Sequence, residues 1–146
     1  MTTTPIEPRL KGTLSPDEYR TKPIPSWGPT YPGMAAAYRN MDYVSIAFAT
    51  DPDKAAALIP KELELLNIPA LGGQAAANLV FAKYRECDLG PYMEVIISIP
   101  VLHKGHVYAY VPAIYVDNDA ALLAGRELGG YPKKMAHITM RNYGNL

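Results

Sequence analysis

Two adjacent lysines, Lys133 and Lys134, have the strongest potential for chemistry in this 146-residue sequence. They follow a glycine pair, Gly129-Gly130, and a Tyr-Pro step whose proline keeps the preceding backbone extended. A neutral lysine amine attacks a ketone to give a protonated imine, which accepts the electrons of a bond that breaks β to it. The pair therefore predicts decarboxylation of a β-keto acid or retro-aldol cleavage, although two lysines in a connection are otherwise typical of a solvated turn.

A nucleophilic lysine has to lose its proton, since at the reference pKa of about 10.4 only about one amine in 2,500 is neutral at pH 7. Burial in a dry pocket and a nearby cation both favour the neutral form, and we expect burial to be the larger effect. Tyr131, Met135 and Tyr115 are candidate pocket walls, and the two tyrosines are candidate substrate-binding residues. Lys134 is the candidate cation. Alternatively it faces away and pairs with an acid such as Glu127, because neighbours on an extended segment point to opposite sides.

Alternating and apolar runs predict the elements that position these lysines. We expect strands over residues 43–48, 76–84, 93–101, 106–116 and 136–141, and short helices over residues 52–58 and 120–128. The strand over residues 43–48 carries apolar residues on both faces, so we expect both faces to be at least partly covered. The second helix ends at Gly129-Gly130 and leads directly to the lysine pair.

The N-terminal segment differs in composition from the rest, because seven of the fourteen prolines lie in its 33 residues. This pattern predicts an irregular Pro-rich arm over residues 1–33. Trp27 and Tyr31 are large apolar groups that are expected to cover a surface, for example on a neighbouring subunit. Residues 34–146 are expected to form one domain.

The segment from Asp117 to Ala136 resembles the signature of the acetoacetate decarboxylase family, in which Gly-Arg-Glu precedes a short spacer and Tyr/Phe-Pro-Lys-Lys. A looser similarity covers Tyr43 to Glu64. The resemblance implies an α+β, β-rich domain with short helices and a closed, cone-shaped β-barrel. Family members continue with several more strands, so residues 34–146 correspond to the N-terminal portion of that fold and its C-terminal part is expected to be missing. The family also implies homo-oligomers.

The resemblance assigns roles to individual residues. It makes Lys133 the imine-forming residue and Lys134 its companion, and it places Glu94 at the family's active-site glutamate, suited to proton transfer. The family's substrate-binding arginine falls at Met41, and Arg39, two residues upstream, is the candidate substitute. An arginine would bind a substrate carboxylate through its bidentate fork, which methionine cannot do.

The resulting functional prediction is a carboxy-lyase that converts an acetoacetate-like β-keto acid to acetone and CO₂ through a lysine Schiff base. The lysine itself is the electron sink, so no cofactor or metal is expected. An aldolase or dehydratase that acts on a pyruvate-like keto acid with the same lysine is the alternative within this chemistry. A truncated, non-catalytic binding or interaction module is the alternative from another class.

Charge and composition argue against several other functions. Fourteen basic residues balance fourteen acidic ones, so the cationic excess typical of nucleic-acid or anionic-membrane binding is missing. Cys87 is the only cysteine and cannot form an internal disulfide. His103 and His106 are not accompanied by further ligands at metal-binding spacing. With neither a signal-peptide pattern nor a membrane-length apolar run, we expect a cytoplasmic protein without membrane or nucleic-acid partners.

Overall fold

The computed structural model describes residues 11–15, 31 and 36–141. The chain divides into two compact units, residues 1–30 and 31–146, and the second contains all the helices and strands that are described. Most of the predicted arm, including Trp27, lies outside the described residues.

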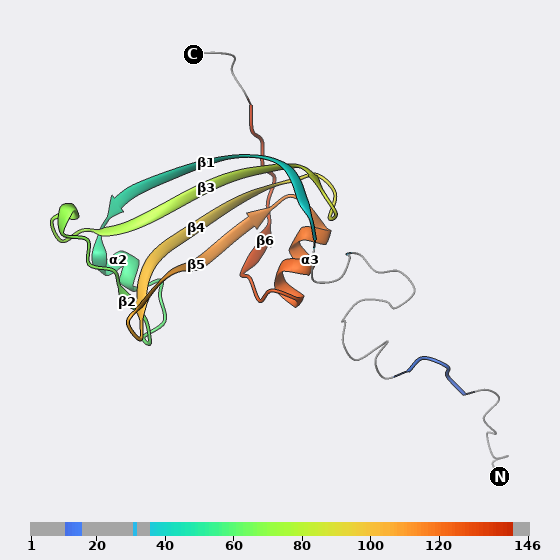
Figure 1. Cartoon of the computed structure of the whole chain (residues 1–146), viewed down its shortest axis with the longest axis horizontal. Coiled ribbons are helices and arrows are strands. Elements are labelled where there is room, and N and C mark those ends of the chain that lie inside the picture. Colours follow the sequence, from blue (N-terminus) through green and yellow to red (C-terminus); the bar gives the residue numbers. More distant parts are fainter. Residues whose placement is uncertain (1–10, 16–30, 32–35, 142–146) are drawn as a thin grey trace, which may run out of the picture. The chain divides into compact units, whose positions relative to one another are not determined.

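A six-stranded sheet with short helices makes up the second unit (Figure 1). Its elements are β1 (Tyr38–Thr50), α2 (Pro52–Ala56), β2 (Glu64–Leu65), the 3₁₀ turn η1 (Pro69–Leu71), β3 (Ala75–Cys87), β4 (Tyr92–His103), β5 (His106–Val116), α3 (Asp119–Glu127) and β6 (Lys133–Met135). The strand order is β1-β3-β4-β5-β6, and β2 pairs with β4. All pairs are antiparallel except β5 with β6. None of the helices in the described part of the chain is long and apolar enough to cross a membrane.

The β-rich α+β architecture is confirmed, but the sheet is open in the described residues, with β1 and β6 at its two ends. The expectation of cover on both faces of residues 43–48 is wrong. All of β1 except Thr50 is exposed, because no described element packs over this edge strand. Large apolar side chains on both of its faces, such as Tyr43 and Val44, therefore face solvent.

The last predicted strand is displaced toward the lysine pair. The structure places β6 at Lys133–Met135 and leaves residues 136–141 without regular structure. Lys133 pairs with Ile114 and Met135 pairs with Val116, which is the last residue of β5. Beyond Val116 the neighbouring strand offers no partner, so the ladder stops there even though the alternating sequence continues.

The helix α3 forms where the sequence supplies a cap and small residues. Asn118 caps it by accepting a hydrogen bond from the Ala121 N–H at 2.9 Å. Ala120 and Ala121 are buried against the sheet, and Ala121 belongs to the core cluster that contains Val116. After the helix, Gly130 adopts φ +66°, a conformation that suits glycine, and the chain turns back into β6. The lysine pair is thereby fixed between α3 and β5.

Candidate active site

The amine of Lys133 and the carboxylate of Glu94 form a buried ion pair. Lys133 Nζ donates to Glu94 Oε2 at 2.7 Å, and the two side chains are only 8% and 6% exposed. The register brings them together, because Lys133 pairs with Ile114 on β5 and Glu94 pairs with Val116 of the same strand. This is the only ion pair with both side chains buried among the residues that the structure describes.

The side chain of Lys133 passes directly over Gly125 of α3. A Cβ atom at Gly125 would lie 2.5 Å from Cδ and Cε of Lys133 and 3.2 Å from its Nζ, so only glycine leaves room for the lysine. Arg126 next to it donates from Nη1 to the Lys133 carbonyl at 3.0 Å. Sequence reasoning used Gly125 and Arg126 only as part of a signature. Their roles depend on the distance between α3 and β6, which the sequence does not contain.

Three tyrosines form an aromatic wall beside the ion pair. The rings of Tyr38 and Tyr84 are 5.0 Å apart, those of Tyr84 and Tyr92 are 4.5 Å apart, and Lys133 Nζ lies 5.8 Å from the Tyr92 ring. Burial raises the pKa of Tyr92, with a further contribution from its hydrogen bond to Tyr38. Burial also raises the pKa of Tyr84, assisted by the charge of Glu94. The sequence signal that could have found Tyr92 is its position two residues before Glu94, on the same strand face.

Two cavities flank Lys133 and share Tyr38, Tyr131 and Lys133 as lining residues. The sheet cavity, about 410 Å³, is lined in addition by Met41, Tyr84, Tyr92, Glu94, Ile96, Val111 and Ile114. The helix cavity, about 320 Å³, is lined in addition by Ala36, Leu89, Ala121, Ala124, Gly125, Leu128 and Gly129. Among these described lining residues, Glu94 and Lys133 are the only acid and the only cation. The amine therefore stands between two apolar spaces.

Of the other predicted site residues, Tyr131 lines both cavities, but Tyr115 lines neither. The neighbouring Ile114 faces the sheet cavity, and alternation along β5 turns Tyr115 to the other face, where its pairing partner is Lys134. Met135 is half exposed and lines neither cavity, so its expected role as a wall is not supported.

Lys134 lies on the opposite side of β6 from Lys133 and is exposed. It forms no ion pair with the described residues, including the suggested partner Glu127. Glu127 instead accepts a hydrogen bond from the Tyr31 hydroxyl, and this bond raises the pKa of Tyr31 to about 12. Tyr31, near the end of the predicted arm, thus contacts the last turn of α3.

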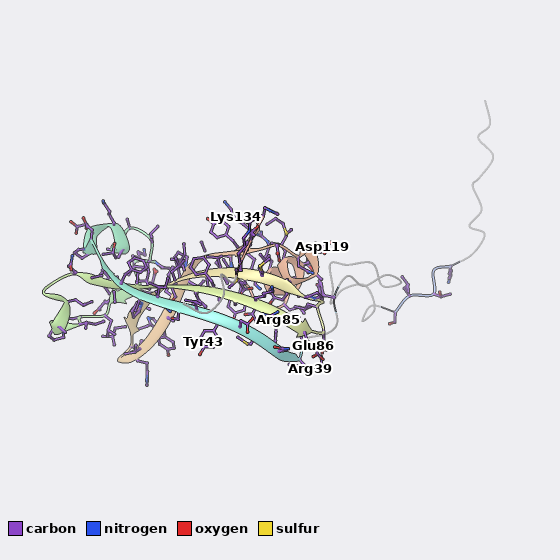
Figure 2. The ribbon with its side chains drawn as sticks, turned by 90° about the horizontal axis from the view of Figure 1, so that it is seen from above. Arg39, Tyr43, Arg85, Glu86, Asp119 and Lys134 are labelled. Atoms are coloured by element: carbon purple, nitrogen blue, oxygen red, sulfur yellow. The ribbon has the colours of Figure 1, made fainter. Side chains whose placement is uncertain are left out.

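Arg39 is not brought to the site. Its guanidinium binds Asp88 at 2.8 Å and lines neither cavity, whereas Met41 lines the sheet cavity. The Ala37 N–H and the Arg39 guanidinium together lower the pKa of the Asp88 carboxyl. Figure 2 shows Arg39 beside Glu86 at the β1 edge of the sheet, and Lys134 toward the opposite edge. A cation for a substrate carboxylate is thus not provided by Arg39 in this arrangement.

Comparison with known proteins identifies the family. The model of the family described as acetoacetate decarboxylase (ADC) matches residues 21–145. The chain belongs to the acetoacetate decarboxylase family. The acetoacetate decarboxylase of Paraburkholderia phytofirmans is 32% identical over 115 residues, which cover 78% of this chain and 43% of that protein. The chain thus spans less than half the length of this relative.

Solved structures show the same fold. A structure of acetoacetate decarboxylase matches with a TM-score of 0.77 and 27% identity, over 90% of this chain and 52% of that one. The enduracididine biosynthesis enzyme MppR, complexed with the condensation product of pyruvate and imidazole 4-carboxaldehyde, matches with a TM-score of 0.62 and 21% identity, over 92% of this chain and 55% of that one. The second match shows the fold alone. The expected acetoacetate decarboxylase-like fold is therefore confirmed for this part of the family architecture.

The family signature coincides with the structural centre of the site. Gly125 and Arg126 act on Lys133 from the helix, and Glu94 faces it from β4. A primary amine, a carboxylate within hydrogen-bond reach and apolar walls are the groups needed for imine formation with proton transfer. The arrangement can bind a small ketone covalently and exchange a proton at its adjacent carbon.

Proposed function

We propose that this protein is a carboxy-lyase that decarboxylates a small β-keto acid of the acetoacetate type through a Schiff base at Lys133. The observation that carries the proposal is the buried pair of Lys133 and Glu94, 2.7 Å apart, at the junction of two apolar cavities. Membership of the acetoacetate decarboxylase family supports it.

Imine formation begins with the transfer of a proton from Lys133 Nζ to Glu94 Oε2, for which the present hydrogen bond is aligned. The lone pair of Nζ then forms a bond to the ketone carbon. The ketone oxygen leaves as water, after taking up the proton from Glu94 and the second proton that the amine releases. The product is an iminium ion with one proton on nitrogen and a positive charge next to the reacting carbon.

Decarboxylation follows when the bond between the α-carbon and the carboxylate breaks. Its electron pair moves into the new carbon–carbon double bond of the enamine, the iminium nitrogen becomes neutral, and CO₂ leaves. Glu94, protonated again from solvent, gives its proton to the α-carbon, and water hydrolyses the iminium to the ketone and free Lys133. The apolar walls favour this step, because the carboxylate and the iminium are poorly solvated there and both charges are lost when CO₂ and the neutral enamine form.

Borohydride reduction tests this mechanism. The protein is incubated with acetoacetate or pyruvate, reduced, digested and mapped by mass spectrometry. We expect an isopropyl adduct, derived from acetone, at Lys133 with acetoacetate. Lys133→Arg should lose the adduct, whereas Lys134→Arg, the matched control on the exposed face, should keep it. An adduct with pyruvate alone would favour an aldolase or dehydratase, and no adduct at Lys133 with either ketone would refute both lyase functions.

We also infer that the protein forms a homo-oligomer through β1. Among the residues that the structure describes, one edge of this strand has no strand partner, and the strand exposes large apolar residues, among them Ile46 and Phe48, as interfaces commonly do. Light scattering of the purified protein should give a multiple of the 16.0 kDa chain mass, and Ile46→Lys should reduce it. Leu58→Lys, an exposed apolar residue outside β1, is the control. The inference would be contradicted if the wild type and Ile46→Lys were both monomeric.

A cytoplasmic location is a further part of the proposal. The single cysteine, Cys87, is a free thiol buried in the fold, which suits a reducing compartment. Fractionation of cells that produce the protein would test this, and recovery from an exported fraction would contradict it.

A further inference from the structure

We propose that the helix cavity holds the apolar chain of a β-keto acid whose acyl group is longer than the methyl of acetoacetate. This substrate class rests on the proposed chemistry at Lys133. The sheet cavity would then contain the reacting half of the molecule, and the helix cavity would select the chain. The first supporting observation is geometric, since Lys133 lines both cavities.

Glu94 determines which half of the substrate lies in which cavity. The ketone carbon bonded to Nζ carries two substituents, the α-carbon with its carboxylate and the acyl chain. The α-carbon receives the proton after CO₂ leaves, so it has to face Glu94, which lines the sheet cavity and not the helix cavity. The acyl chain diverges from the same trigonal carbon, and the helix cavity is the second space that Lys133 lines.

The lining of the helix cavity fits a hydrocarbon. Apart from Tyr38, Tyr131 and Lys133, its described walls are apolar side chains or glycine backbone, chiefly Leu89, Ala124 and Leu128, and Lys133 is the only charged residue among them. Lys133 reacts with the ketone, so the other described lining residues provide no charged partner for a second carboxylate, an amine or a phosphate. A site with these walls gains binding energy mainly by removing methylene groups from water.

The size of the helix cavity exceeds what acetoacetate requires. Its volume of about 320 Å³ corresponds to the space of about ten water molecules in the liquid. A single methyl group would leave most of this space to be filled by water beside apolar walls. Ala124, a small residue, lines the α3 side and lets a chain lie against the helix.

Chain-length dependence tests the assignment. We would measure kcat/KM for acetoacetate, 3-oxohexanoate and 3-oxooctanoate, and expect a rise of about fourfold for each methylene that is buried. Ala124→Leu fills the cavity from α3, so the ratio of kcat/KM for 3-oxooctanoate to that for acetoacetate should fall at least tenfold. Ala56→Leu in α2, an exposed helical alanine at the far end of the sheet, is the matched control and should leave the ratio unchanged (Figure 1).

Binding of methyl ketones separates failure of the cavity assignment from failure of the chemistry. Dissociation constants of acetone, 2-pentanone and 2-heptanone would be measured by calorimetry with the unreduced protein. If 2-heptanone binds more tightly than acetone and Ala124→Leu abolishes this difference, the cavity assignment is supported. This holds even when borohydride traps nothing at Lys133, because the lack of an adduct would refute only the lyase function. Turnover or binding that does not increase with chain length, or an equal effect of Ala124→Leu on all ligands, overturns the assignment.

Discussion

Gly125 and Lys133 are so close that the lysine side chain lies where a residue other than glycine at position 125 would have its Cβ atom. Such a Cβ atom would lie only 2.5 Å from Cδ and Cε of the lysine. The helix cannot readily retreat there, because the Gly125 carbonyl accepts the Tyr131 N–H at 2.9 Å and Arg126 holds the Lys133 carbonyl. The position of the amine is thus set by the lack of a side chain on its neighbour.

Gly125→Ala is therefore expected to move the amine without unfolding the protein. Lysine is flexible and can swing away, and alanine is favoured over glycine within a helix by about 1 kcal/mol. A displacement of about 1 Å at a reacting group can lower the rate about 100-fold. We expect a loss of this order in kcat and of the borohydride adduct at Lys133, with a cooperative thermal transition retained. Gly12→Ala, where a Cβ meets nothing within 4 Å, is the control, and full activity of Gly125→Ala would contradict the steric role.

The ion pair predicts a characteristic pattern of stability. Removing one partner leaves the other charge buried, so Lys133→Met and Glu94→Leu should each cost about 3–5 kcal/mol in the free energy of unfolding. The double variant removes both charges, so its free energy of unfolding should be close to that of the wild type or higher. Urea unfolding of the four proteins gives the coupling energy, and additive losses would mean that the two groups do not interact.

The sequence allowed the site to be predicted where local pattern and signature coincide. Residues 106–116 form a nearly continuous apolar run, and β5 occupies the same residues. The helix expected over residues 120–128, ending at the glycine pair, lies within one residue of α3 at each end. The resemblance to the family indicated Lys133 and Glu94, the two groups that the structure brings to 2.7 Å.

Other features depend on contacts between distant segments and could not be predicted. The three tyrosines of the aromatic wall come from three strands, and only the register places Tyr38 against Tyr84. The end of β6 depends on where β5 stops, whereas the alternation of residues 136–141 is a local property. The resemblance offers Arg39, two residues upstream of the family's arginine position, as a substitute, but its guanidinium binds Asp88 instead.

Tyr92 predicts a loss of stability in alkaline solution. Its pKa lies above the ordinary value of 10.0 in the folded protein, mainly because of burial. Below pH 10 both states keep the proton. Above pH 10 the unfolded state releases it first, so the folded state becomes less stable as the pH rises, by up to about 1.4 kcal/mol per pH unit. In urea unfolding between pH 9 and 11, Tyr92→Phe should show a shallower decline than the wild type. Tyr43→Phe, at an exposed position, is the control for loss of a hydroxyl, and equal slopes in wild type and Tyr92→Phe would contradict the effect.

Substitution of Met41 is expected to change how tightly the protein binds the substrate carboxylate. It lines the sheet cavity and is 45% exposed, so an arginine is sterically tolerable there. The arginine adds a cation to a cavity where Lys133 is the only other cation among the described lining residues. A charge-assisted hydrogen bond contributes about 1.5–3 kcal/mol, so Met41→Arg should lower the KM for acetoacetate about tenfold or more. The carboxylate loses its charge on the way to CO₂, so the arginine stabilises the ground state more than the transition state, and kcat should fall. Val44→Arg, on the opposite face of β1, should change neither constant. A folded Met41→Arg protein with an unchanged KM would show that the carboxylate does not lie in the sheet cavity.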